Sequence, residues 1–410
     1  MPGPNGVTGR AWARAAFAMF GVGWGANQFA PMLTVYRIRD GLSEASVTAM
    51  YGVYALGLIP SLLVVGPYSD RRGRRVVLRP VVVLSVAASL VLIAGAGRPW
   101  LLYVGRFLAG VASGSAFSAG SAWVKELSEG APDGAGARRA AVALSAGFGG
   151  GPFCAGLVAQ WLPHPRVLPY VVHIALMALV IGTVWMAPET VSLDRARRSA
   201  RRRLLPRSAA HPRFTRAVAP WSPWVFGTAT IGFATLPALV ARHTGGVPVA
   251  FNGAMTGLTL LSGILSQPAA RRLAVRSHTL PPVAGLIAAV AGLGLSAVVA
   301  VVPFPWYALP AAVLLGAGYG ILLVSGLWEV ERLADEDELA ALVALFYALI
   351  YLGFAVPFLI AVLAVRIGYV GCFLTGAAIV SASVVPTIRA LRAHPAPRAY
   401  ESRTDQADVR

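Results

Sequence analysis

Ionisable side chains are scarce in the apolar runs of this sequence, and the few that interrupt them are the residues that could do chemistry. Residues 66–75 read GPYSDRRGRR, which sets an aspartate and four arginines between two long apolar runs. Arg106 and His173 fall inside other apolar runs. Such residues form ion pairs and carry protons. No phosphate-binding loop, metal-ligand spacing or nucleophile motif accompanies them, so we expect neither an enzyme nor a bound cofactor or metal.

The elements that must position these residues follow from the hydrophobic pattern. Of the 410 residues, 57% are hydrophobic and only 13% are charged. Runs of about 20 residues with almost no charge recur along the chain, and each is long enough to cross a bilayer as a helix. We therefore predict an all-α integral membrane protein with twelve transmembrane helices. Cys154 and Cys372 both fall inside predicted spans, so no disulfide framework is indicated.

The net charge of +18 indicates membrane topology rather than a nucleic-acid partner. Most of the 35 Lys and Arg residues fall in links that are cytoplasmic if the chain starts in the cytoplasm. The positive-inside rule then predicts that both termini are cytoplasmic. Abundant Ala, Arg and Gly with a single lysine are typical of a high-GC bacterium. We expect a multi-pass protein of the bacterial inner (cytoplasmic) membrane, surrounded by lipid and monomeric.

An internal repeat divides the predicted spans into two sets. Trp100, Gly110 and Gly114 recur as Trp306, Gly316 and Gly320, and Pro31 recurs as Pro237, each 206 positions later. Trp123, Glu126, Pro152 and Phe153 recur as Trp328, Glu331, Pro357 and Phe358, each 205 positions later. We predict two pseudo-symmetric six-helix bundles, residues 1–190 and 217–390, joined by an Arg-rich cytoplasmic linker, 191–216, and followed by a cytoplasmic tail, 391–410. Such repeats enclose a site near the bilayer midplane that opens alternately to each side.

The charged stretch at 66–75 links the second and third predicted spans. Its pattern G-x-x-x-D-R-x-G-R-R resembles the signature loop of the major facilitator superfamily and is matched by Gly66, Asp70, Arg71, Gly73, Arg74 and Arg75. The resemblance implies tight turns at the glycines and a charge network that braces neighbouring helices in one transport state. The alternative is a solvated loop that only obeys the positive-inside rule. The second half carries SQPAARR at 266–272, with alanine at the position of Asp70.

Two further motifs sharpen the resemblance. In the fourth span, Arg106 and Gly110 are similar to the R-x-x-x-G pattern of the superfamily. A cation inside hydrocarbon is costly, which makes Arg106 a functional candidate, and snorkelling to the membrane surface is the alternative. In the fifth span, a small-residue hinge resembles the antiporter motif of the twelve-span drug:proton antiporters, and its residues are Gly147, Gly151, Pro152 and Gly156.

Polar and aromatic residues within the spans predict a substrate cavity. They are Trp24, Asn27, Gln28, Tyr51, Tyr54, Asn252, Tyr347 and Tyr351. Aromatic walls with a few amides and one cation suit a bulky, partly apolar molecule. For each of these residues, hydrogen bonding or anchoring between helices is the alternative.

The coupling ion is less well specified, because no Asp or Glu lies deep in any predicted span. The candidates for carrying protons are Asp40, His173, Glu126 and Glu329, with Glu331 close by. We expect a secondary transporter that exports small amphiphilic or aromatic molecules, with protons as the coupling ion. A secondary importer or facilitator of a small nutrient is the first alternative, and a receptor or scaffold on the same fold is the second.

Overall fold

All regular structure in the described residues is helical. The computed structural model describes residues 11–132, 134–191, 206–335 and 338–394. Within these ranges, nine helical segments are long and apolar enough to cross a membrane. The predicted all-α membrane class is confirmed, and part of the predicted linker, 192–205, and most of the predicted tail, 395–410, lie outside the described residues.

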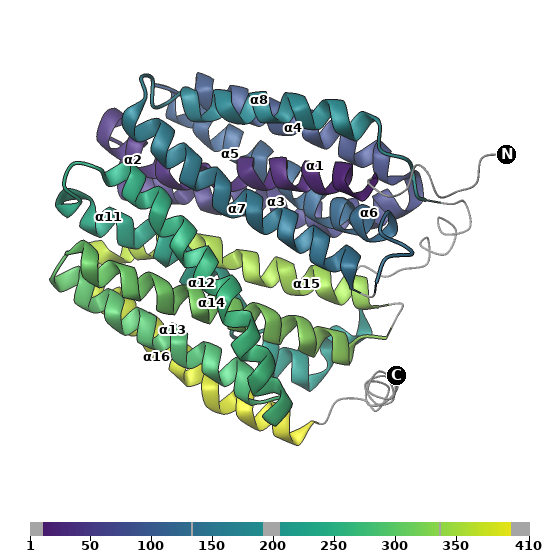
Figure 1. Ribbon diagram of the computed structural model, residues 1–410. Helices are drawn as coiled ribbons and strands as arrows, with labels where there is room; N and C mark the ends of the chain where they lie inside the picture. The colour runs from purple at the N-terminus through teal and green to yellow at the C-terminus, as the bar shows by residue number, and fades with distance from the viewer. Residues whose placement is uncertain (1–10, 133, 192–205, 336–337, 395–410) are drawn as a thin grey trace.

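The first half of the chain, α1–α8, forms one group of helices in Figure 1. Its helices are α1 (Ala11–Asn27), α2 (Phe29–Asp40), α3 (Glu44–Arg72), α4 (Arg74–Ala94), α5 (Pro99–Ser115), α6 (Ser121–Glu126), α7 (Ala135–Trp161) and α8 (Leu168–Trp185). A π-helical turn, Ala116–Gly120, joins α5 to α6.

The second half, α10–α16, forms the other group (Figure 1). Its helices are α10 (Ser222–Thr230), α11 (Leu236–Val240), α12 (Pro248–Arg276), α13 (Leu280–Val301), α14 (Pro305–Leu333), α15 (Leu339–Tyr351) and α16 (Val356–Ala393). Short turns of 3-10 or π helix complete it: Arg207–Ala210, Phe214–Val218, Ile231–Thr235, Ala241–His243 and Leu352–Ala355.

Interrupted helices explain why nine segments are consistent with twelve predicted spans. The first span is divided at Gln28 into α1 and α2, and the fourth is divided by the π-helical turn. The last two spans form one continuous helical run of 55 residues. Gly368 reverses that run, because its φ of 71° and ψ of 164° are not helical.

Glycines related by the sequence repeat make the same contact in each half. A Cβ on Gly110 would lie 2.1 Å from the Tyr54 carbonyl oxygen, so α5 meets the backbone of α3 there. A Cβ on Gly316 would lie 2.2 Å from the Thr259 carbonyl oxygen, so α14 meets α12 in the same way. Small residues let membrane helices approach this closely. The repeat in sequence is therefore a repeat in helix packing.

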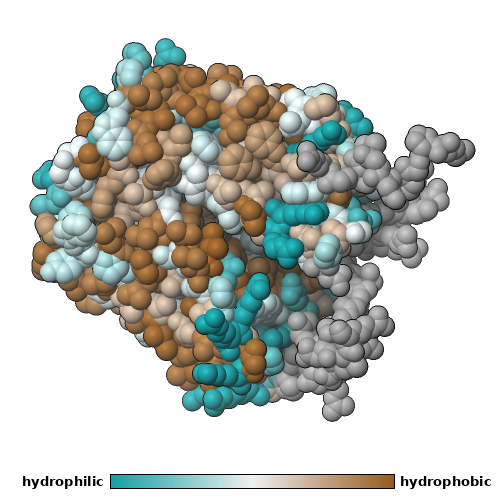
Figure 2. Space-filling model, viewed as in Figure 1, coloured by the Kyte–Doolittle hydropathy of each residue, from teal (hydrophilic) through white to brown (hydrophobic). Residues whose placement is uncertain are grey.

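The two ends of the molecule carry different ion pairs. α1 begins and α16 ends at the same end (Figure 1). We call this the charged end, because the ion pairs of Arg74 and Arg213 lie there, and we call the other, which carries Asp40 and Glu44, the opposite end. Figure 2 shows a mostly hydrophobic outer surface and a recess where the two groups of helices meet.

Candidate functional site

The loop at 66–75 is a compact ion-pair cluster centred on Arg74. Helix α3 ends at Arg72, Gly73 turns the chain with a φ of 109°, and α4 begins at Arg74. Arg74 lies 2.6 Å from the Asp70 carboxylate and 2.7 Å from that of Glu126. Its side chain is only 4% exposed, so both partners stabilise a charge that is largely removed from water. The structure thus brings Asp70 and Arg74 together, with Glu126 as a third member.

A carboxylate that the sequence analysis missed completes this cluster. Glu189 accepts hydrogen bonds from the backbone N–H groups of Arg74 and Arg75, both at 2.9 Å. It therefore caps the start of α4, where the first N–H groups have no helical partner. The φ of 109° at Gly73, which other residues rarely adopt, explains a glycine there. The only sequence signal is an acidic residue directly after the sixth apolar run.

The remaining loop residues lie around this cluster. A Cβ on Gly66 would lie 2.8 Å from the Ser118 hydroxyl oxygen, so this glycine packs against the π-helical turn. The side chain of Arg71 is exposed. Arg75 is half-buried and contributes its backbone N–H to Glu189. The loop is thus a folded element rather than an extended solvated link.

The second half carries a different charged cluster. Arg213, which the sequence analysis also missed, holds Glu329 through Nε at 2.5 Å and through NH2 at 3.3 Å. Arg332 reaches the same carboxylate at 2.8 Å. The candidate proton carriers Glu126 and Glu329 are therefore both engaged by arginines, whereas Glu331 is exposed.

Arg106 is buried in the first half, so the snorkelling alternative is wrong. Its side chain is 0% exposed, and NH1 donates to the Ala26 carbonyl oxygen at 3.0 Å, next to the break between α1 and α2. The guanidinium carbon lies 4.3 Å from the ring centre of Tyr54 and 4.4 Å from that of Phe29. The Tyr51 ring follows at 5.4 Å. Cation–π contacts of this kind stabilise the charge.

The four tyrosines predicted to line a cavity belong to one aromatic cluster that joins the halves. Tyr51 and Tyr54 lie 5.6 and 5.5 Å from the Phe354 ring, which lies 5.5 Å from Tyr351. Tyr347 continues the cluster at 6.5 Å from Tyr351.

Phenylalanines that the sequence analysis missed complete this aromatic cluster. Phe226 stacks on Tyr351 with ring centres 4.7 Å apart, and Phe233 lies 5.9 Å from Tyr51. The repeat could have found Phe233, because Phe233 follows the cavity candidate Asn27 by the 206 positions that relate Pro31 to Pro237.

The amides and the histidine near the first span form a buried polar network. Gln28 reaches the Ser89 hydroxyl at 3.5 Å, and Ser89 bonds to His173 Nδ1 at 2.8 Å. His173 Nε2 lies 3.1 Å from the Gly21 carbonyl oxygen. A carbonyl only accepts, so Nε2 carries the proton and Nδ1 accepts from Ser89. Asn27 is buried close by, at 5% exposure.

The glycines of the fifth span face two different partners. A Cβ on Gly151 would lie 2.5 Å from the Trp24 carbonyl oxygen, and Gly147 meets the same helix, α1. Gly156 faces the second half instead, because its Cβ would lie 3.1 Å from the Cα of Gly253 in α12. We call the contact of α7 with α12 the seam. Gly151 therefore packs inside the first half, and Gly156 lies at the seam.

Polar contacts join the two halves at the opposite end. Gln160 accepts from the backbone N–H of Val249 at 3.0 Å and caps the start of α12. Asn252 donates to the Thr34 hydroxyl at 2.9 Å, and Tyr369 donates to Glu44 at 2.7 Å. The predicted cavity residue Asn252 thus bridges the two halves.

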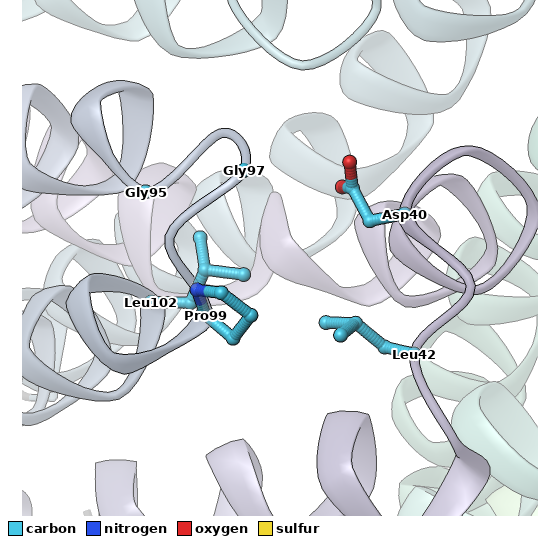
Figure 3. A pocket seen from close by; sticks show the side chains of 6 residues that line it. All are labelled: Asp40, Leu42, Gly95, Gly97, Pro99 and Leu102. Carbon is cyan, nitrogen blue, oxygen red and sulfur yellow. The ribbon is translucent and has the colours of Figure 1, made fainter.

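Asp40 lines a small pocket at the opposite end. The pocket has a volume of about 120 Å³ and is lined by Asp40, Leu42, Gly95, Gly97, Pro99 and Leu102 (Figure 3). One carboxylate oxygen of Asp40 pairs with Arg166, and the other is buried without a protein partner. Among the described residues, no cluster of His, Cys, Asp and Glu is suited to a metal ion.

Comparison with known proteins identifies the family. The profile of the Major Facilitator Superfamily matches residues 15–356. A class D tetracycline resistance protein of Salmonella ordonez is 31% identical over 148 residues, which are 34% of this chain and 36% of that protein. The chain therefore aligns with about a third of that relative's length.

Solved structures share the fold at low sequence identity. The nucleoside transporter NupG superposes with a TM-score of 0.74 at 12% identity, over 93% of this chain and 99% of that chain. A POT family transporter in complex with 5-aminolevulinic acid gives a TM-score of 0.74 at 12% identity, over 92% and 95%. The chain belongs to the Major Facilitator Superfamily and is a membrane transporter, not an enzyme.

Proposed function

We propose that this transporter exports small amphiphilic or aromatic molecules by alternating access, with protons as the counter-ion. The observation that carries the direction of transport is the antiporter-type motif of α7, whose Gly156 meets α12 at the seam while Gly151 meets α1. One helix thereby couples packing inside the first half to contact between the halves. The similarity to a tetracycline resistance protein supports export as well.

The substrate would bind between the halves, beside the aromatic cluster. Tyr51, Tyr54 and Tyr351 offer ring faces there, with Arg106 behind Tyr51 and Tyr54 in the first half. Predominantly aromatic walls with a few polar groups suit a molecule of mixed polarity.

Asp40 is the strongest proton carrier among the four candidates. Glu126 and Glu329 are committed to arginines, and both ring nitrogens of His173 are hydrogen-bonded. Asp40 keeps one buried carboxylate oxygen without a protein partner. Protonation of this oxygen would neutralise Asp40 and end its ion pair with Arg166, while the hydrogen bond from Arg166 to the other oxygen could remain.

Accumulation in cells tests the export proposal. Cells that produce the protein should accumulate less tetracycline, or less of at least one neutral, cationic or anionic aromatic dye, than cells without it. Gly156→Leu should abolish the difference at equal expression, because the added side chain forces α7 and α12 apart at a cost of about 1–3 kcal/mol. Gly149→Leu is the matched control, since a Cβ there meets nothing within 4 Å. Greater accumulation in producing cells would favour the importer alternative.

The proton can be tested separately in everted vesicles. Addition of a substrate should release protons from vesicles with the wild-type protein, and an uncoupler should abolish substrate uptake into them. Asp40→Asn should remove the proton signal while purified protein still binds the substrate. Uptake that ignores the uncoupler would replace antiport with facilitated diffusion.

The loop cluster has its own transport test. Asp70→Asn should leave membrane insertion intact, because Arg74 keeps Glu126 as a buried partner. It should strongly reduce transport if the cluster stabilises one access state, since such states differ by only a few kcal/mol. Transport at the wild-type rate would leave the loop with a purely topological role.

A further inference from the structure

Three buried arginines, Arg74, Arg213 and Arg106, differ in the partners of their Nε and NH2 groups. Arg74 holds Glu126 through Nε at 3.1 Å and NH2 at 2.7 Å. Arg213 holds Glu329 through the same two nitrogens. In Arg106, Nε and NH2 are buried and have no protein partner. We infer that Arg106 binds a carboxylate, or an equally planar anionic group, of the transported molecule, so that the substrates of this transporter are aromatic acids.

The unpaired Nε and NH2 groups of Arg106, which we call its open edge, favour a carboxylate. Nε and NH2 are parallel donors in the plane of the guanidinium, and a carboxylate accepts from both at once. The third nitrogen, NH1, is already fixed by the Ala26 carbonyl oxygen at 3.0 Å, which sets the direction of the open edge. Among the described residues, no Asp or Glu forms an ion pair with Arg106. A bound anion would supply the complementary negative charge that the described residues do not supply.

The groups around the open edge add an aromatic preference. Phe29 and Tyr54 cover the guanidinium with their rings, at 4.4 and 4.3 Å from its central carbon. Their faces stabilise the cation, but they do not accept the in-plane N–H bonds of Nε and NH2. The Tyr51 hydroxyl and the Gln28 side-chain oxygen are also buried without a protein partner. A planar acid would therefore find ring faces and a cation in one place.

Access to Arg106 follows from the position of the aromatic cluster. Tyr51 and Tyr54 contact Arg106 on one side and Phe354 of the second half on the other. Separation of the halves, which the proposed function requires, would remove Phe354 from the two tyrosines and expose the way to the guanidinium. The inference therefore rests on the proposed function and names its substrate class. An organic cation would be repelled by the unpaired arginine.

Binding to purified full-length protein tests the inference without transport. The probes are 2-naphthoate and its neutral isostere 2-naphthamide, measured by equilibrium dialysis on protein in lipid nanodiscs. Wild-type protein should bind the acid at least about tenfold more tightly, because a hydrogen bond to a charged group contributes about 1.5–3 kcal/mol. Arg106→Gln should remove this preference, and Arg106→Lys should restore part of it. Equal affinity for both probes in the wild type would overturn the inference.

A structural role and a binding role of Arg106 predict different affinities in these variants. If Arg106→Gln retains the preference for the acid, or if Arg106→Lys fails to recover any of it in folded protein, Arg106 does not bind the anion. Arg98→Gln is the control and should leave the preference unchanged, because Arg98 is exposed and lies outside the buried site.

Transport separates failure of this inference from failure of the proposed function. Export of naphthoate in preference to naphthamide supports both. Export of a cationic or neutral dye without any effect of Arg106→Gln keeps the exporter and refutes the anion site. Import of naphthoate that depends on Arg106 refutes the direction of transport and keeps the site.

Discussion

The charged ends of the two halves are built from the same pair of residue types in different ways. In the first half, a single glycine separates α3 from α4, and Arg74 at the start of α4 binds Asp70 and Glu126. In the second half, α12 is as long as α3, at 29 residues, but three residues, 277–279, separate it from α13. Ala270 stands at the place of Asp70, and the glutamate is held by Arg213, which precedes the first long helix of that half.

Helix packing, by contrast, is the same in both halves. Gly110 and Gly316 contact the backbones of α3 and α12 at matched positions. Every membrane bundle needs such close contacts, so both copies of the repeat have kept them. A charge cluster acts only on the elements that it joins, and the two halves join different elements. The duplicated unit is therefore symmetric in packing and asymmetric in electrostatics.

The packing side of this comparison predicts the largest effect. Gly110→Ala and Gly316→Ala should each prevent accumulation of folded protein, because the Cβ would lie 2.1 or 2.2 Å from a backbone oxygen that cannot rotate away. The controls are Gly52→Ala and Gly257→Ala, where a Cβ meets nothing within 4 Å. Size-exclusion profiles of fluorescent fusions measure the outcome. Tolerance of one glycine substitution but not the other would break the packing symmetry.

The ion pairs predict the next largest effect. Loss of one partner from a buried pair lowers stability by about 3–5 kcal/mol, and Glu329→Gln should lie in this range because it leaves Arg213 and Arg332 facing each other. Glu126→Gln should have a smaller effect, since Arg74 retains Asp70. Unfolding in denaturant measures the stability of both variants. The double variant Asp70→Asn/Glu126→Gln should lose about as much stability as Glu329→Gln. A double variant as stable as Glu126→Gln alone would contradict this account.

The cap at the start of α4 predicts a smaller effect. Glu189→Ala should lower the free energy of unfolding by about 0.5–1 kcal/mol, the lower part of the range for helix caps, because Glu189 is exposed. It should also reduce transport if the cap positions Arg74. Val191→Ala is a neighbouring control that leaves the two backbone bonds of Glu189 intact. A loss as large as that of Glu329→Gln would mean that Glu189 does more than cap the helix.

The second half offers a counterpart of this cap, and its effect should be the smallest. Glu338 accepts from the backbone N–H groups of Ser208 and Arg207, both at 3.0 Å, and these bonds lower its pKa below the ordinary value of glutamate. A carboxylate with a lowered pKa stabilises the fold above its unfolded pKa, and the stabilisation is lost as the pH falls through the folded pKa. Glu338→Ala should therefore lower the unfolding temperature slightly at pH 7. The difference should vanish near pH 3, and a difference that persists there would exclude the carboxylate as its cause.

The sequence by itself determined the membrane class, the repeat and the signature loop. Each of these is a local property: a run of apolar residues long enough for a bilayer, a constant spacing of Trp, Gly and Pro, and a ten-residue pattern. The pairing of Asp70 with Arg74 was within reach for the same reason, because residues four apart lie on one face of a helical turn.

Only the tertiary structure decided which charge meets which. Arg213 and Glu329 are 116 positions apart, and Glu189 caps a helix whose first residue lies 115 positions before it. The sequence placed Arg106 in a span but left open whether it snorkels, since that depends on whether neighbouring helices bury it. Packing puts three aromatic rings and no carboxylate of the described residues around it, because helix contacts between distant segments set the surroundings of a buried charge.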